Sequence, residues 1–466
     1  MKVNDKEKDM NKDFIIGSIK KMFNENMIEF FVLKNNLKGS KYQMWWATFF
    51  EGTGLTEEGS KLFQQMIENI LESPEISEIA TREEVISYLQ STLTELIKIK
   101  KEDRLKFIIK EGNSIVKKLI SLRENVELIF PILNLELKVR SLRLGNVNIF
   151  HFSNYQLQKQ LKYRKQLMNN NPYFIEKPSE IKDLMKQYKE LLIKEYHNKV
   201  CAKIDFNKSP KKNYEDSIQE IQTALACLKL FSDHIHVRNS CQFGLEGSIV
   251  KMGALECLIK LKNGSSWKTY GGLIGYINKF TIDHDFIKNA NSKGLMILKS
   301  ILVKNKKNEI EKRILNSIFW YAKSYDVSLA KYQKNQNDKK KDDRLNILTH
   351  EIGEKFLKLI ICLESLLLFK DFKEDKKEYL KQRGSFILLC TKKDEEKIQR
   401  IIDKSYIIRN DIVHQGYVNV NYRQLIELDY LVKKMITNLI KNYKKWNINT
   451  NTDLYKWFEK KRLSAI

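Results

Sequence analysis

The chain has 466 residues, of which 42% are hydrophobic, 11% aromatic and 30% charged. These proportions exclude collagen-like, intrinsically disordered and disulfide-scaffold proteins, and the length indicates two or three domains. No stretch approaches the roughly 18 consecutive apolar residues of a membrane span, because the most apolar segment, 357–369, contains Lys358 and Glu364. The N-terminus lacks an apolar signal core, and we therefore expect a cytoplasmic protein without a membrane segment.

The net charge of +25 points to an anionic partner such as nucleic acid. The chain is also rich in Lys, Asn and Ile, a skew that an AT-rich genome produces whatever the function, so charge alone leaves both explanations open. The six cysteines include no CxxC pair, which argues against cysteine-ligated zinc. The sequence HEIGE at 350–354 begins like a zinc-protease helix, but Glu354 stands where the second His ligand is needed. We therefore expect no metal and no cofactor.

The hydrophobic pattern predicts a mainly α fold with a few short strands. Segment 14–123 has helical spacing, and Thr81 with Glu84 forms a capping-box pattern. Segment 126–152 alternates apolar and polar residues around Gly145-Asn146, which predicts two or three strands. Helical spacing returns over 157–196 with a break near 169–172, and a short strand is expected at 200–206.

Three regions follow from these patterns. We expect an N-terminal helical region at 1–125, a mixed α/β middle region at 126–305 and a C-terminal helical bundle at 306–466. Segment 238–290 has no clear periodicity, whereas the chain is plainly helical from Glu309 onwards.

The most informative motif lies in KIQRIIDKSYIIRNDIVHQGY, residues 397–417. An apolar stripe at helical spacing consists of Ile398, Ile401, Ile402, Ser405, Ile408 and Ile412. At 100° per residue, Arg409 falls about 20° from Ile398, which predicts a guanidinium in the middle of the apolar face. His414 lies at the expected helix end, just before the helix-stopping Gly416.

An Arg on an inner face and a His at a helix C-terminus can together grip and protonate a phosphodiester. Simpler roles exist for each residue. Arg409 can form a structural ion pair with Glu364, His414 can cap the helix, and Asn410 can solvate its end.

The motif RN-x-x-x-H of Arg409, Asn410 and His414 resembles the ribonuclease members of the HEPN superfamily (higher eukaryotes and prokaryotes nucleotide-binding domain). The order of segments before it is similar to that of the Apea-like HEPN domains of bacterial abortive-infection and anti-phage proteins. The resemblance covers roughly residues 305–445. The segments that carry it are ILNSIFWYAKSY (314–325), FLKLIICLESLLLF (356–369), YLKQRGSFILL (379–389) and RNDIVHQG (409–416).

This resemblance implies a HEPN-type antiparallel bundle at 306–466 and a metal-independent endoribonuclease. Its products would carry a 2′,3′-cyclic phosphate and a 5′-hydroxyl, and its role would be that of a toxin-like effector in anti-phage defence. Arg409, Asn410 and His414 would be catalytic, with Glu364 and Arg383 in support. The implied partners are RNA (tRNA, rRNA and mRNA not distinguished), a phage-derived trigger and a second copy of the chain, because only one convincing copy of the motif exists.

Two alternatives from other functional classes stay open. The bundle can be a non-catalytic HEPN module that binds RNA or nucleotide or serves as a dimerisation platform. Alternatively, the first 300 residues can hold the main activity or the sensing function, and the bundle is then structural.

Overall fold

The computed structural model describes residues 14–21, 28–30, 53–55, 57–170, 178–232, 243–245, 257–261, 264–268, 280–325, 341–369, 376–388, 391–416, 420 and 422–464. The chain forms two compact units. The first comprises Met1–Val126 with Phe206–Asp216, and the second comprises Glu127–Asp205 with Ser217–Ile466. The fold is mainly helical with a smaller, largely antiparallel sheet, which confirms the predicted fold class.

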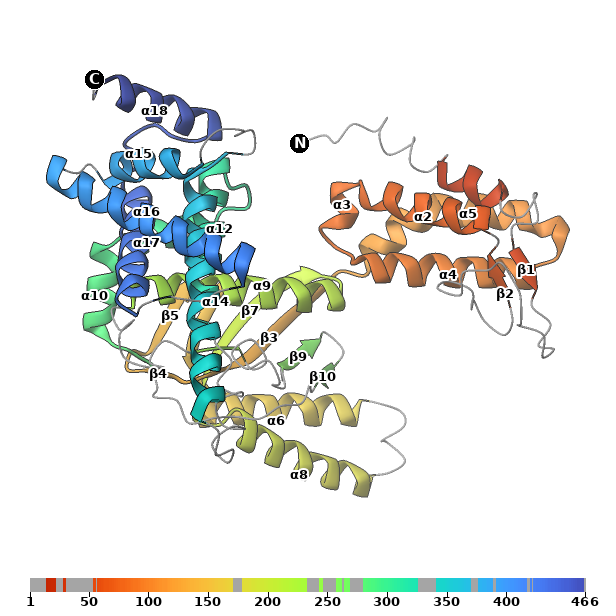
Figure 1. Ribbon diagram of the computed structural model, residues 1–466. Coiled ribbons are helices and arrows are strands. Elements are labelled where there is room, and N and C mark those ends of the chain that lie inside the picture. The colour runs from red at the N-terminus through yellow and green to blue at the C-terminus, as the bar shows by residue number, and fades with distance from the viewer. Residues whose placement is uncertain are drawn as a thin grey trace. The chain divides into compact units, whose positions relative to one another are not determined.

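The first unit consists mainly of helices that pack around a hydrophobic core of their own (Figure 1). Ile15, Met66, Leu89 and Leu119, each in a different helix, are among the side chains buried there. The helical pattern expected for the whole of 14–123 is wrong at 28–30 and 53–55, which pair as strands. Its helices are α2 (Glu57–Leu71), α3 (Pro74–Ser77), α4 (Arg82–Lys98) and α5 (Lys101–Ser121), and two short antiparallel strands are β1 (Ile28–Phe30) and β2 (Thr53–Leu55).

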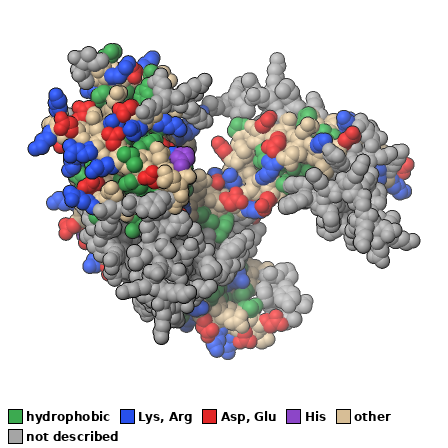
Figure 2. Space-filling view, in the orientation of Figure 1, with side chains coloured by type: hydrophobic (Ala, Val, Ile, Leu, Met, Phe, Trp, Pro, Cys, Tyr) green, Lys and Arg blue, Asp and Glu red, His purple; other side chains and the backbone are tan. Residues whose placement is uncertain are grey.

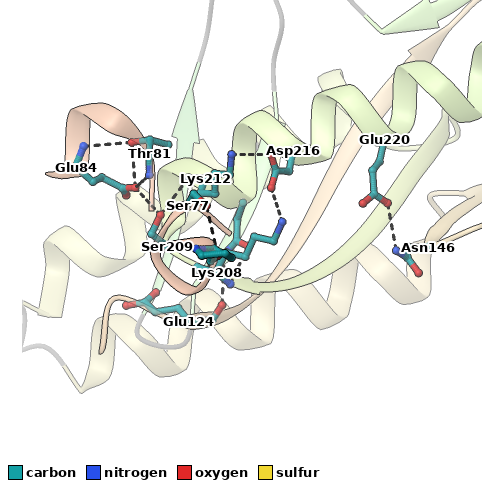
Figure 3. Close-up of polar contacts among 12 residues, drawn as sticks. Ser77, Thr81, Glu84, Glu124, Asn146, Lys208, Ser209, Lys212, Asp216 and Glu220 are labelled. Atoms are coloured by element: carbon teal, nitrogen blue, oxygen red, sulfur yellow. Dashed lines mark hydrogen bonds and ion pairs between the residues drawn. The ribbon is translucent and has the colours of Figure 1, made fainter. Parts of the chain in front are cut away.

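The capping box expected at Thr81 and Glu84 is confirmed and has an additional partner (Figure 3). Thr81 Oγ1 accepts from the Glu84 amide at 3.2 Å, and Glu84 Oε2 accepts from the Thr81 amide at 2.8 Å. The same carboxylate oxygen accepts from Ser209 Oγ at 2.5 Å. One glutamate therefore caps α4 and also holds the segment 206–216 within the first unit.

The second unit contains a sheet in which the path β10-β9-β3-β7-β6-β5 is joined by β8 at β3. The hairpin between β5 and β6 turns at Gly145, whose φ of 61° favours glycine. The strand predicted at 200–206 is confirmed, and the segment 126–152 holds four strands where two or three were predicted. The strands are β3 (Glu124–Leu133), β5 (Ser141–Leu144), β6 (Val147–His151), β7 (Val200–Lys208), β8 (Gly244–Leu245), β9 (Cys257–Leu261) and β10 (Gly264–Lys268). A separate parallel pair consists of β4 (Leu135–Leu137) and β11 (Phe280–Ile282).

Helices α6 (Asn154–Asn169) and α8 (Pro178–Glu195) pack against each other and against this sheet. They meet it through a buried cluster that includes Phe150, Phe152, Leu157, Tyr196 and Cys201. Ile129 of β3 and Phe150 of β6 belong to this cluster, so their side chains mark the face of the sheet that the helices cover. Residues two positions away on the same strands point to the same face.

The rest of the second unit is helical, and α14, α15, α16 and α17 contact one another as a bundle (Figure 1). A Cβ on Gly384 of α15 would lie 2.5 Å from Met435 Cε of α17, so a side chain at this position would have to displace the flexible end of Met435. Within the described residues no helix is long and apolar enough to cross a membrane. The helices are α9 (Pro210–Phe231), α10 (His284–Ser292), α11 (Leu295–Leu302), α12 (Glu309–Lys323), α14 (Lys341–Leu367), α15 (Lys376–Leu388), α16 (Lys392–Gln415), α17 (Tyr422–Asn442) and α18 (Asn451–Ser464).

Candidate active site

The three residues of the RN-x-x-x-H motif lie in the last two turns of α16. This helix begins after Thr391, whose side chain accepts a hydrogen bond from the Asp394 amide. It ends at Gly416, which has a φ of 65° and donates its amide to the Asp411 carbonyl. The sequence thus specifies both ends of the helix, and His414 lies at the C-terminal end as predicted.

The inward position predicted for Arg409 is wrong. Ile398, Ile402, Ser405 and Ile408 are buried as expected, but Arg409 is half-buried. A helical wheel gives the direction of a side chain, whereas burial also depends on how far the neighbouring helices extend. Towards its end α16 is less covered, because Ile412 is half-buried while Val413 and His414 are exposed.

Asn410 lies between the other two residues of the motif. Arg409 and His414 are separated by about 140° around the helix and about 7.5 Å along it, so their backbone positions face different directions. Asn410 and His414 are neighbours at i,i+4. Arg409 Nη1 donates to Asn410 Oδ1 at 3.1 Å, which directs the guanidinium towards the face that carries His414. Among the described residues, none makes a hydrogen bond to the exposed His414 ring.

Tyr406 connects Arg409 to Glu364. Its hydroxyl donates to Oε1 of Glu364 on α14, and the Arg409 guanidinium lies 5.9 Å from the centre of its ring. In the described part of the chain no ion pair joins Arg409 directly to Glu364, so the salt bridge considered from the sequence is replaced by a bridge through an aromatic ring. Tyr406 is buried, which fixes the surface on which Arg409 rests.

Arg383 holds the end of the helix that carries Glu364. It is 2% exposed, and its Nη1 donates to the Leu367 carbonyl at 2.8 Å, one turn beyond Glu364. Its guanidinium lies 4.8 Å from the ring of Phe369 and 5.1 Å from that of Phe458. Burial lowers the pKa of Arg383 to about 10, so the group keeps its charge at neutral pH.

Arg313 of α12 acts on the same helix end, and sequence reasoning missed it. Its Nη1 donates to the carbonyls of Ser365 and Leu368 at 2.9 and 2.7 Å, and its guanidinium lies 4.8 Å from the Phe369 ring. Burial lowers its pKa to about 10 as well. Two cations therefore satisfy carbonyls that the last turn of α14 leaves unpaired. The only sequence signal was an Arg near an apolar helical stripe.

The predicted residues thus form two connected groups. At the exposed end of α16 the three groups are the guanidinium of Arg409, the amide of Asn410 and the imidazole of His414. Glu364 is linked to this group through its hydrogen bond with Tyr406. Arg383 contacts none of the three and acts on the last turn of α14. Within the described residues no group of three or more His, Cys, Asp or Glu side chains is placed to hold a metal ion.

Comparison of the chain with family models, with curated proteins and with solved structures finds no match in any of the three.

Proposed function

We propose that the chain is a metal-independent endoribonuclease whose catalytic groups are Arg409, Asn410 and His414. The observation that carries the proposal is their common position at the exposed end of α16, with Arg409 bonded to Asn410 and supported by the ring of Tyr406. A guanidinium binds the non-bridging oxygens of a phosphate, and an imidazole transfers protons near neutral pH. The net charge of +25 favours an anionic substrate. Figure 2 shows Lys and Arg side chains interspersed with Asp and Glu over the helical part of the second unit.

The proposed reaction needs one base and one acid. The 2′-hydroxyl oxygen of the RNA attacks the adjacent phosphorus while its proton passes to an imidazole. The bond between phosphorus and the 5′-oxygen breaks, and that oxygen leaves with the bonding electron pair and takes a proton from an acid. Arg409 stabilises the charge that develops on the non-bridging oxygens. The products are a 2′,3′-cyclic phosphate and a 5′-hydroxyl.

A second copy of the chain would supply the second imidazole. One chain offers a single Arg409 and a single His414, and therefore a single imidazole. Two copies paired about a two-fold axis would bring two imidazoles to one groove, and the pair would then hold both a base and an acid. We therefore propose a homodimer with a composite site, acting as a toxin-like effector in anti-phage defence.

The test is cleavage of end-labelled RNA by the full chain in EDTA. His414→Ala should abolish cleavage, with His284→Ala, which changes an exposed His at the start of α10, as its matched control. Arg409→Lys should also fail, because an ammonium cannot form the two parallel bonds of a guanidinium. Arg400→Ala changes an exposed Arg on the opposite side of α16 and should cleave normally.

Normal cleavage by a folded His414→Ala protein would exclude the catalytic assignment. Binding of RNA without cleavage by the wild-type chain would favour the non-catalytic alternative.

A further inference from the structure

A recess in the second unit lies between the first turns of α6 and the sheet, away from the motif on α16. Its volume is about 140 Å³. Three polar side chains occupy its sheet side, namely Asn148 on β6, Lys203 on β7 and Glu127 on β3. Asn148 and Lys203 are register partners, and Lys203 Nζ lies 3.0 Å from Glu127 Oε2. The three residues therefore form one polar row across three adjacent strands.

This row lies where a sheet covered by helices is normally apolar. β3, β7 and β6 are interior strands, and the next row on the same face, Ile129, Cys201 and Phe150, belongs to the buried cluster beneath α6 and α8. Charged residues are seldom covered in this way unless they are paired or bind something. Lys203 and Glu127 pair with each other, which meets part of the need for a partner. An ammonium has three donors and a carboxylate has several acceptor sites, so both groups can form further hydrogen bonds.

The α6 side of the recess contains an unsatisfied acceptor. Gln160 is 3% exposed, and its Oε1 has no hydrogen-bond partner among the described residues. A buried carbonyl oxygen without a donor is costly, and a ligand N–H group would remove that cost. One turn earlier the ring of Tyr155 is 74% exposed at the recess, and the exposed Lys159 lies between them in sequence.

We propose that this recess binds a mononucleotide. The base would stack on the Tyr155 ring and donate an N–H group to Gln160 Oε1, while the exposed Lys159 attracts the phosphate. Lys203 is already paired with Glu127 at 3.0 Å and Asp205 at 3.6 Å. A flat ring that donates hydrogen bonds and carries an anionic group matches the exposed aromatic ring of Tyr155, the unpaired acceptor of Gln160 and the exposed cation of Lys159. This site does not depend on the ribonuclease proposal, because it shares no residue with it.

The test is calorimetric titration of the full chain with AMP, GMP, CMP and UMP. At least one should bind with 1:1 stoichiometry per chain. Tyr155→Ala should weaken that binding about ten-fold or more through loss of stacking. Gln160→Leu should weaken it about ten-fold without lowering the melting temperature, since a similar volume replaces an unsatisfied acceptor. The matched controls are the exposed Gln166→Leu and Lys165→Ala on the same helix.

Several results would overturn the proposal. One is the absence of binding by all four nucleotides, and another is binding that Tyr155→Ala and Gln160→Leu leave unchanged. Loss of binding in His414→Ala would place the nucleotide at the α16 site instead. A single-stranded tetranucleotide that binds more tightly than every mononucleotide, with the same response to the variants, would make an RNA base the occupant.

Discussion

The hydroxyl of Tyr406 donates to Oε1 of Glu364, and this bond joins α16 to α14 beneath Arg409. Because Tyr406 is buried and Arg409 rests over its ring, the position of the guanidinium depends on a residue outside the RN-x-x-x-H motif. Arg313 and Arg383 in turn fix the last turn of α14, one turn beyond Glu364.

Tyr406→Phe should lower the rate of RNA cleavage and should also lower the free energy of unfolding, without unfolding the protein. The ring stays in place, but Glu364 loses its donor and α16 loses a link to α14. A hydrogen bond to a charged group contributes about 1.5–3 kcal/mol, so the free energy of unfolding should fall by about 2 kcal/mol. Tyr430→Phe, at a 64% exposed position on α17, is the control for both denaturation and cleavage. Equal cleavage by the two variants would show that Tyr406 does not position Arg409.

Arg383→Met should destabilise the second unit by about 2–3 kcal/mol, because it removes a charged donor from a buried carbonyl and a cation from three aromatic rings. Arg462→Met, at an exposed position on α18, should change stability by less than about 0.5 kcal/mol. Urea denaturation measures both. Because Arg313 contacts the same helix end, the double variant should lose less than the sum of the single losses.

Asp429 should make stability depend on pH. It is 3% exposed and accepts from the Tyr325 hydroxyl at 2.8 Å. Burial raises its pKa to about 6 from an ordinary value of 3.8, although Lys433 and Lys355 act in the opposite direction. The folded state thus binds this proton more tightly than the unfolded chain. Stability should therefore rise as pH falls from above 6 towards 4, by about 3 kcal/mol at most.

Asp429→Asn should remove that slope and stabilise the protein at pH 7 to 8, because the amide oxygen still accepts from Tyr325 and no buried charge forms. Denaturation from pH 4 to 8 measures the effect, and Asp285→Asn at an exposed position on α10 is the control. An unchanged slope in Asp429→Asn would mean that another group titrates.

The composite site can be tested by mixing Arg409→Ala and His414→Ala chains. Their heterodimer holds one intact Arg409 and one intact His414, and if one of each suffices the mixture should cleave RNA that neither variant cleaves alone. Light scattering at about 0.5 M salt should still show dimers, because dimers bridged only by RNA weaken steeply with salt. An RNA-free monomer that cleaves RNA would contradict the composite site.

Local patterns predicted much of the fold. The capping box of Thr81 and Glu84, the turn at Gly145 and the helix end at Gly416 all depend on residues within a few positions of one another. The strands β8, β9 and β10 were not predicted, because they lie in 238–290, where no hydrophobic period is visible. Pairing with β3 defines β8 and β9, and pairing with β9 defines β10.

The candidate site shows the same limit. The sequence places Arg409, Asn410 and His414 on one helix end, since all three lie within six residues. It does not reveal that Tyr406 meets Glu364 across 42 residues, or that Arg313 and Arg383 meet at one helix end. Such contacts depend on how helices pack, and a helical wheel carries no information about that.

We propose that this chain cuts RNA without a metal ion through Arg409 and His414. The most direct measurement is the chemistry of the RNA ends that the purified chain produces in EDTA. If the proposal is right, the wild-type chain should produce 5′-hydroxyl ends and 2′,3′-cyclic phosphates, and His414→Ala should produce no new ends. Products with 5′-phosphates and 3′-hydroxyls, or cleavage that appears only when a divalent metal is added, would contradict it.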